Sequence, residues 1–191
     1  MKNSILILIS LAFFPFKNQA QTVTDIDGNV YNTVTIGTQV WMKENLKVTH
    51  YNNGDEIPNI EDNAAWTGLS NGAYCNYQND NDFVDTYGRL YNWFAVDDGR
   101  EICPTGWHIA TDAEWTILSD YLGGRHIAGG KLKEAGTTHW ASPNTGATNS
   151  SGFTGLPSGM RSSVDGIFGY QTEGCGFWSN TQVNATEADS V

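Results

Sequence analysis

Apolar and polar residues recur along this chain in a pattern that predicts short strands around one principal helix. An apolar stripe with the spacing of one helical face runs through Trp115, Leu118 and Leu122. Thr111 and Glu114 stand just before it in the order of a capping box, in which each residue's side chain accepts from the other's backbone N–H. The pattern therefore predicts a helix over about 112–122 that is anchored in the core by Trp115.

Strand-like alternation is found on both sides of this helix. It predicts strands within 23–42, at 74–77, in the first part of 87–96, at 159–161, at 167–170 and at 176–180. The pattern also predicts a short helix over Glu61–Leu69, a helical turn at the end of 87–96 and a short amphipathic turn over 128–134. Residues 136–160 are mostly Gly, Thr, Ser, Asn and Pro, and they predict a long loop that either carries binding or packs on the core through its own aromatic residues.

The ends of the chain differ in character from its middle. Residues 1–20 have a basic start, an apolar run and a small final residue, which is the order of a secretory signal peptide cut after Ala20. The apolar run is too short for a membrane span, and no later segment is apolar enough for one. The rest has the size of one domain, which we place at 21–180, followed by a polar tail over 181–191.

The charge balance narrows the range of partners. The formal net charge is −11, with 10 basic and 21 acidic residues, so the surface repels nucleic acid and anionic lipid. Export, acidity and many Tyr, Trp and Asn residues suit an extracellular glycan or a cell-surface protein instead.

Candidate metal sites are few in this sequence. Asp80, Asp82 and Asp85 form the densest carboxylate cluster, and oxygen-rich loops of this kind suit calcium. They are the only calcium candidates; a solvated polar loop is the alternative. Asp25 begins a segment that resembles an EF-hand loop, but the twelfth position is Ile36 instead of the required Glu, so the segment predicts a hairpin turn.

No known catalytic arrangement is present in the sequence. The four histidines have no zinc spacing among themselves or with the cysteines, and the common hydrolase, metalloprotease and dinucleotide motifs are missing. We therefore expect no enzyme activity. Export permits disulfides, and the candidates are Cys75, Cys103 and Cys175, although an odd count leaves one thiol without a partner.

Several longer motifs are shared with one bacterial family. They are Gly37–Leu46, Tyr87–Trp93, Cys103–His108 followed by Thr111–Trp115, Ala128–Lys133, Gly152–Pro157 and Gly176–Ser179. In these motifs, over about 25–180, the chain resembles the Fibrobacter succinogenes major paralogous domain, a secreted domain of unassigned activity common in Bacteroidetes-type bacteria. More distantly, it is similar to formylglycine-generating enzymes and so to the C-type-lectin-like fold.

The resemblance implies an α+β, C-type-lectin-like fold with a twisted antiparallel sheet, one or two short-to-medium helices and long loops. We expect structural roles for Trp93, Trp107, Trp115 and Trp178, beside Thr111 and Glu114 of the capping box. The family's domain continues into further strands and a final Cys, so we expect this domain to be truncated at its carboxyl end.

The resemblance also bears on function. Formylglycine-generating enzymes bind copper through a cysteine pair near the end of the domain, whereas here only Cys175 stands in that region. We therefore predict a secreted, non-catalytic binding or interaction module at the cell surface or outside the cell, without a cofactor unless calcium binds. The alternatives are a polysaccharide-binding module and a degenerate formylglycine-generating-type oxidoreductase.

Overall fold

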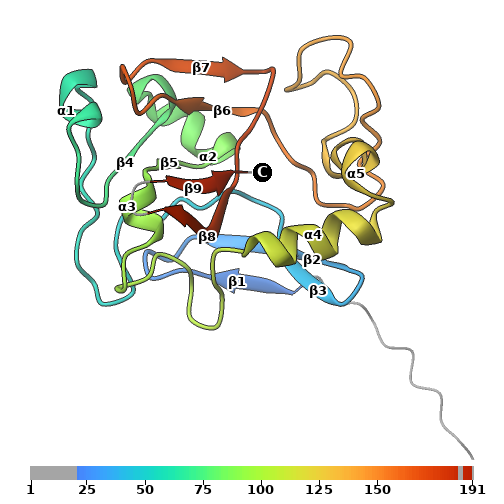
Figure 1. The fold of residues 1–191 in the computed structure, drawn as a ribbon, viewed down its shortest axis with the longest axis horizontal. Helices are drawn as coiled ribbons and strands as arrows, with labels where there is room; N and C mark the ends of the chain where they lie inside the picture. The colour runs from blue at the N-terminus through green and yellow to red at the C-terminus, as the bar shows by residue number, and fades with distance from the viewer. Residues whose placement is uncertain (1–20, 185–186, 191) are drawn as a thin grey trace, which may run out of the picture.

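The computed structural model describes residues 21–184 and 187–190, in which short strands and helices are joined by long loops (Figure 1). The predicted signal peptide over 1–20 lies outside the described residues. Helices mix with antiparallel sheets, which confirms the predicted α+β class, while the C-type-lectin-like topology stays a prediction. Among the described residues, no helix has the length and apolar character needed to cross a membrane.

The amino-terminal sheet has three antiparallel strands: β1 (Thr22–Thr24), β2 (Val30–Ile36) and β3 (Gln39–Met42). The turn between β1 and β2 is organised by Asp25, a buried carboxylate. Its Oδ1 accepts from the N–H groups of Asp27 (3.0 Å) and Asn29 (2.9 Å), and its Oδ2 accepts from the hydroxyl of Tyr31 (2.6 Å). This carboxylate therefore holds a hairpin turn, as the sequence predicted.

Three further sheets have two antiparallel strands each. The pairs are β4 (Tyr74–Cys75) with β5 (Leu90–Tyr91), β6 (Ser158–Arg161) with β7 (Phe168–Gln171), and β8 (Trp178–Asn184) with β9 (Glu187–Ser190). The last pair differs from the polar tail expected over 181–191, because β8 runs past 180 and β9 pairs with it. β8 and β9 are strands because their backbones pair with each other, and such pairing need not leave an alternation of apolar residues in the sequence.

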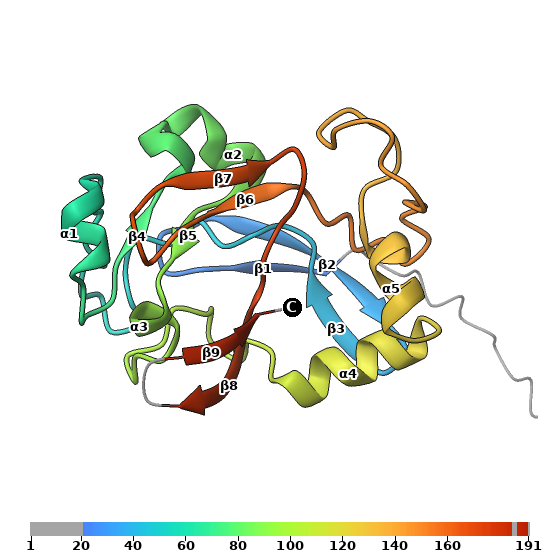
Figure 2. The ribbon, with the colours of Figure 1, turned by 45° about the horizontal axis from the view of Figure 1, so that its top comes forward.

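The principal helix is α4 (Asp112–Tyr121), where the sequence predicted it. The capping box is formed: Thr111 Oγ1 accepts from the N–H of Glu114 (3.3 Å), and Glu114 Oε2 accepts from the N–H of Thr111 (2.8 Å). The helix buries Trp115 and Leu118. Figure 2 shows α4 beside β3, where Gln39 Nε2 donates to the carbonyl of Glu114.

The remaining helices are short. They are α1 (Asn63–Thr67), α2 (Val84–Tyr87), α3 (Trp93–Val96), α5 (Arg125–Leu132) and two 3-10 turns at Tyr77–Asn79 and Asn81–Phe83. The sequence predicted α1 and α3, but α5 begins earlier than the turn expected over 128–134. Gly123 (φ 103°) and Gly124 (φ 98°) adopt left-handed backbone angles, which let the chain reverse after α4 and enter α5 at once.

The predicted long loop is present, because residues 133–157 contain no helix or paired strand. Trp140 and Phe153 from this loop are buried, and Trp140 Nε1 donates to the carbonyl of Gly155 (3.0 Å). Part of this loop therefore packs on the core through its own aromatic residues.

The apolar core is divided into three clusters. The first is built from Val48, Tyr51, Ile57, Trp93, Ala95, Val96 and Ile102. The second contains Ile36, Trp115, Leu118, Leu122, Ala128 and Phe153, and the third contains Trp66, Ala73 and Cys75. This division is unusual, because a domain usually forms one contiguous core.

Candidate functional site

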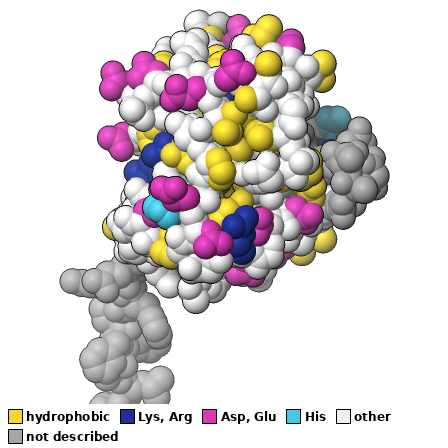
Figure 3. Space-filling view, turned by 90° about the vertical axis from the view of Figure 1, so that its left-hand side faces the viewer, with side chains coloured by type: hydrophobic (Ala, Val, Ile, Leu, Met, Phe, Trp, Pro, Cys, Tyr) yellow, Lys and Arg dark blue, Asp and Glu magenta, His cyan; other side chains and the backbone are white. Residues whose placement is uncertain are grey.

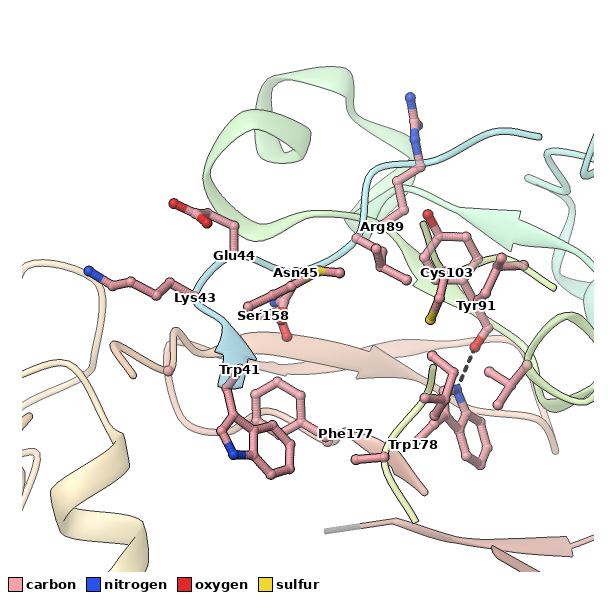
Figure 4. Close-up of a pocket in the computed structure, with 18 of the residues that line it drawn as sticks. Trp41, Lys43, Glu44, Asn45, Arg89, Tyr91, Cys103, Ser158, Phe177 and Trp178 are labelled. Atoms are coloured by element: carbon pink, nitrogen blue, oxygen red, sulfur yellow. Dashed lines mark hydrogen bonds between the residues drawn. The ribbon is translucent and has the colours of Figure 1, made fainter. Parts of the chain in front are cut away.

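A cavity of about 880 Å³ lies where the three clusters meet. Residues from β3, β5, β6 and the start of β8 line it, together with segments between 102 and 110 and between 153 and 156 (Figure 4). The first cluster contributes Ile102, the second Trp115 and the third Trp66. Ligand pockets commonly measure about 300–1,000 Å³, so the cavity has the size of a binding site.

Aromatic rings form one wall of this cavity. Trp41 packs on Trp115 with ring centroids 4.7 Å apart, and Phe177 lies 5.4 Å from Trp115. On another side, Trp178 Nε1 donates to the carbonyl of Tyr91 (2.9 Å), which fixes that indole (Figure 4). These rings are held by mutual packing and one hydrogen bond, so the wall is shaped before any ligand arrives.

Charged side chains stand at the rim and reach away from the rings of Trp41 and Phe177 (Figure 4). The carboxylate of Glu44 is engaged, because Asn32 donates to it through its backbone N–H and its side-chain amide, both at 2.7 Å. Lys43 takes part in no ion pair or side-chain hydrogen bond among the described residues. The rim therefore presents a cation without an ion-pair partner next to a carboxylate held by neutral hydrogen-bond donors.

Arg161 is a rim residue whose guanidinium is largely used by the fold. It donates to the carbonyls of Gly166 (2.9 Å), Ile60 (2.6 Å) and Glu61 (2.7 Å) and to Asn63 Oδ1 (3.0 Å). Its planar group also lies over the rings of Trp66 and Phe168. Arg161 thus joins the β6–β7 hairpin to α1 and the segment before it, and these bonds take four of its five N–H donors.

Arg89 is less completely engaged. Its Nε donates to the carbonyl of Lys47 (2.9 Å), its Nη1 donates to Asn76 Oδ1, and its guanidinium lies 4.7 Å from the ring centroid of Tyr74. Among the described residues, no carboxylate forms an ion pair with Arg89. Acidic side chains are spread widely over the face shown in Figure 3, whereas basic ones are few. Two unpaired cations at one rim are therefore notable in a chain of net charge −11.

The residues expected to be structural lie in or beside this cavity. Trp107, Trp115 and Trp178 line it, and the rings of Trp93 and Trp178 are 5.8 Å apart. Glu114 also lines it and pairs with His108 Nε2 at 2.9 Å. Burial raises the pKa of Glu114, but hydrogen bonds from Thr111 and His108 outweigh burial and lower it overall.

The calcium candidates Asp80, Asp82 and Asp85 lie along the 3-10 turn at Asn81–Phe83 and the start of α2. Asp80 Oδ1 accepts from the N–H of Asp82 (2.9 Å) and so caps a 3-10 turn, and Asp85 lies in the first turn of α2. No group of three or more metal-ligating side chains gathers in the described part of the chain. The carboxylate of Asp80 serves a local turn, and calcium binding by this loop stays a prediction.

The three disulfide candidates are free thiols in this structure. Cys75 and Cys103 are buried, and Cys175 is half-buried. Burial raises the pKa of Cys103 to about 12 and that of Cys175 to about 11, and it also raises the pKa of Cys75. Thiols with such values stay protonated near neutral pH, so they are poor nucleophiles and poor metal ligands.

Sequence reasoning did not assign the cavity. Trp41, Lys43, Arg89 and Phe177 entered only as members of family motifs or predicted strands. More than 130 positions separate Trp41 from Phe177 along the chain. Only the fold brings them together, and no local pattern could have signalled that meeting.

Of the comparisons with known proteins, one assigns the chain to a family. Residues 34–191 match the family model described as the Fibrobacter succinogenes major domain. The comparison with curated proteins gave no significant match, and neither did the comparison with solved structures. Because the family match covers most of the chain, the protein belongs to the Fibrobacter succinogenes major domain family.

Proposed function

We propose that this chain is an exported, non-catalytic interaction module that takes an apolar segment of another extracellular protein into its central cavity. The observation that carries the proposal is the aromatic-walled cavity of about 880 Å³. Its size and its few polar groups at the rim are typical of ligand sites.

The energetics of the cavity support an occupant. The cavity opens to the surface at its rim, so water fills it when no ligand is bound. Water held against aromatic rings has few hydrogen-bond partners there, and an apolar group gains free energy by displacing it.

The placement of the tryptophans favours a protein segment over a glycan. Sugar rings stack on exposed aromatic faces, but none of the seven tryptophans of this chain is exposed. The rings of Trp41, Trp115 and Trp178 line a cavity instead.

Export is supported by the signal-peptide pattern over 1–20 and would be tested by sequencing the amino terminus of the protein recovered outside the cell.

Peptide display selection on the full chain tests the binding proposal. Met160 borders the cavity and is 46% exposed, so Met160→Trp should narrow the mouth without disturbing the core. Val164, in the turn after β6, is 87% exposed and does not line the cavity, which makes Val164→Trp the matched control.

We expect selected apolar peptides to bind the parent and Val164→Trp alike and to lose at least tenfold in affinity on Met160→Trp. Failure to enrich any apolar peptide, or equal binding by both variants, would remove the cavity as the site. Binding to a glycan array without peptide binding would support the polysaccharide alternative.

A further inference from the structure

Strands from four different sheets border the cavity: β3, β5, β6 and β8. Three of them are already contacted on the side away from their sheet partner. The N–H of Gly159 in β6 donates to Gly174 (2.9 Å), and that of Asn180 in β8 donates to Ala110 (2.8 Å). The carbonyl of Tyr91 in β5 accepts from Trp178.

The outer edge of β3 is different. β3 is the last strand of its sheet and pairs only with β2, in a register that sets Trp41 opposite Val34. Among the described residues, no backbone hydrogen bond from outside this sheet reaches Val40, Trp41 or Met42. The N–H of Lys43 donates to the carbonyl of Asn32, so by antiparallel alternation Trp41 forms the next hydrogen-bonded pair with Val34. Val40 and Met42 therefore direct unpaired N–H and C=O groups to the outer edge, beside an apolar cavity.

β3 has only four residues, and short length is itself one protection of a sheet edge, but the strand carries few of the other protective features. Edge strands commonly carry a Lys, a Pro or a bulge, which discourage pairing with another chain. Gln39–Met42 contains none of these, and Val40 is 45% exposed. An edge of this kind is a template for an added strand.

Building on the function proposed above, we propose that β3 accepts an extended strand of a partner protein. The strand is apolar on its side toward the cavity and acidic at the end that passes Lys43 and Arg89. Its backbone pairs with Val40 and Met42, and its alternate side chains enter the space beside Trp41.

The acidic end follows from the rim charges. Lys43 comes directly after β3, so a strand that runs along β3 ends beside it. Lys43 and Arg89 have no carboxylate partner among the described residues, whereas the acidic rim residues Glu44 and Glu114 are hydrogen-bonded within the fold. An acidic flank on the partner would give each cation a counter-charge.

Titration calorimetry with the full chain and a synthetic peptide tests strand addition. The peptide alternates valine with threonine and ends in a pair of aspartates. Its counterpart carries N-methyl groups on the residues that would donate to β3, so it keeps the side chains and loses the backbone bonds. We expect the methylated peptide to bind at least about tenfold more weakly. Amide exchange at Val40 and Met42 should slow when the parent peptide is bound.

The charge requirement has its own control. Lys43→Gln should weaken binding about two- to fivefold at low salt, as loss of an exposed ion pair does. Arg125→Gln removes the same charge from an exposed position on α5 outside the cavity lining, and it should leave the affinity unchanged. Equal effects of the two variants would contradict a specific acidic flank.

The outcomes separate this inference from the function on which it rests. Equal affinity for both peptides would overturn strand addition and leave a cavity that binds side chains alone. No binding of either peptide, together with a failed display selection, would overturn both. Dimers of the chain in light scattering without peptide would assign the β3 edge to a second copy and refute a foreign partner.

Discussion

Replacing Thr111 with Ala tests whether the capping box fixes α4 in the fold. The change removes the Oγ1 that accepts from the N–H of Glu114, and it leaves that donor without its partner at the start of the helix. Loss of an N-cap side chain costs about 1 kcal/mol in the free energy of unfolding. For a chain of this length, that corresponds to a fall in Tm of about 2–4 °C.

Urea unfolding followed by far-ultraviolet circular dichroism measures this change. Thr111→Ser keeps a hydroxyl at the cap and should retain most of the stability. Thr116→Ala alters an exposed position inside the same helix, where Ala is the better helix former, and should be neutral or slightly stabilising. If Thr111→Ala proved no more destabilising than Thr116→Ala, the capping box would not contribute as argued.

Three further predictions concern other parts of the fold. Arg161→Lys cannot reproduce the fork of hydrogen bonds to neighbouring carbonyls and should lower the free energy of unfolding by about 2 kcal/mol in urea titrations. Gly130→Ala should destabilise by about 1–3 kcal/mol in the same assay despite its helical position, because the new methyl group would overlap the carbonyl of Gly146. Burial raises the pKa of Asp27, but hydrogen bonds led by that from the Thr49 N–H lower it overall, below its ordinary value of 3.8. Its ionised form therefore stabilises the fold above that value, and this contribution is lost as the pH falls through the depressed pKa. Urea midpoints measured against pH should show a shallower acid decline for Asp27→Asn than for the parent, and parallel curves would contradict the pairing.

Local signals in the sequence predicted the elements that depend on local chemistry. The capping box and apolar stripe located α4, and the Asp25 turn and the β6–β7 hairpin lay where turn residues placed them. Polar β9 escaped prediction because its formation depends on pairing with β8 and not on an apolar face. The start of α5 was missed because it depends on the two left-handed glycines after α4.

The candidate site lay beyond such local signals. Its wall joins Trp41, Trp115 and Phe177, which lie on a strand, a helix and a loop that are distant in sequence. The indole stripe of α4 predicted that Trp115 faces inward, but not that an open space borders it. Likewise, the sequence could not reveal which of its few cations lacks an ion-pair partner, since that depends on where every carboxylate falls after folding.

The shielded thiols have a practical consequence. Cys75 lies in β4, Cys103 in the segment before α4, and Cys175 between β7 and β8, so they sample three separate regions. An alkylating reagent reaches a buried thiol only when its surroundings open. The rate at which each cysteine of the native protein is labelled would thus report how often its region opens, with no engineered probe. Cys175 is the least buried of the three thiols and should react first.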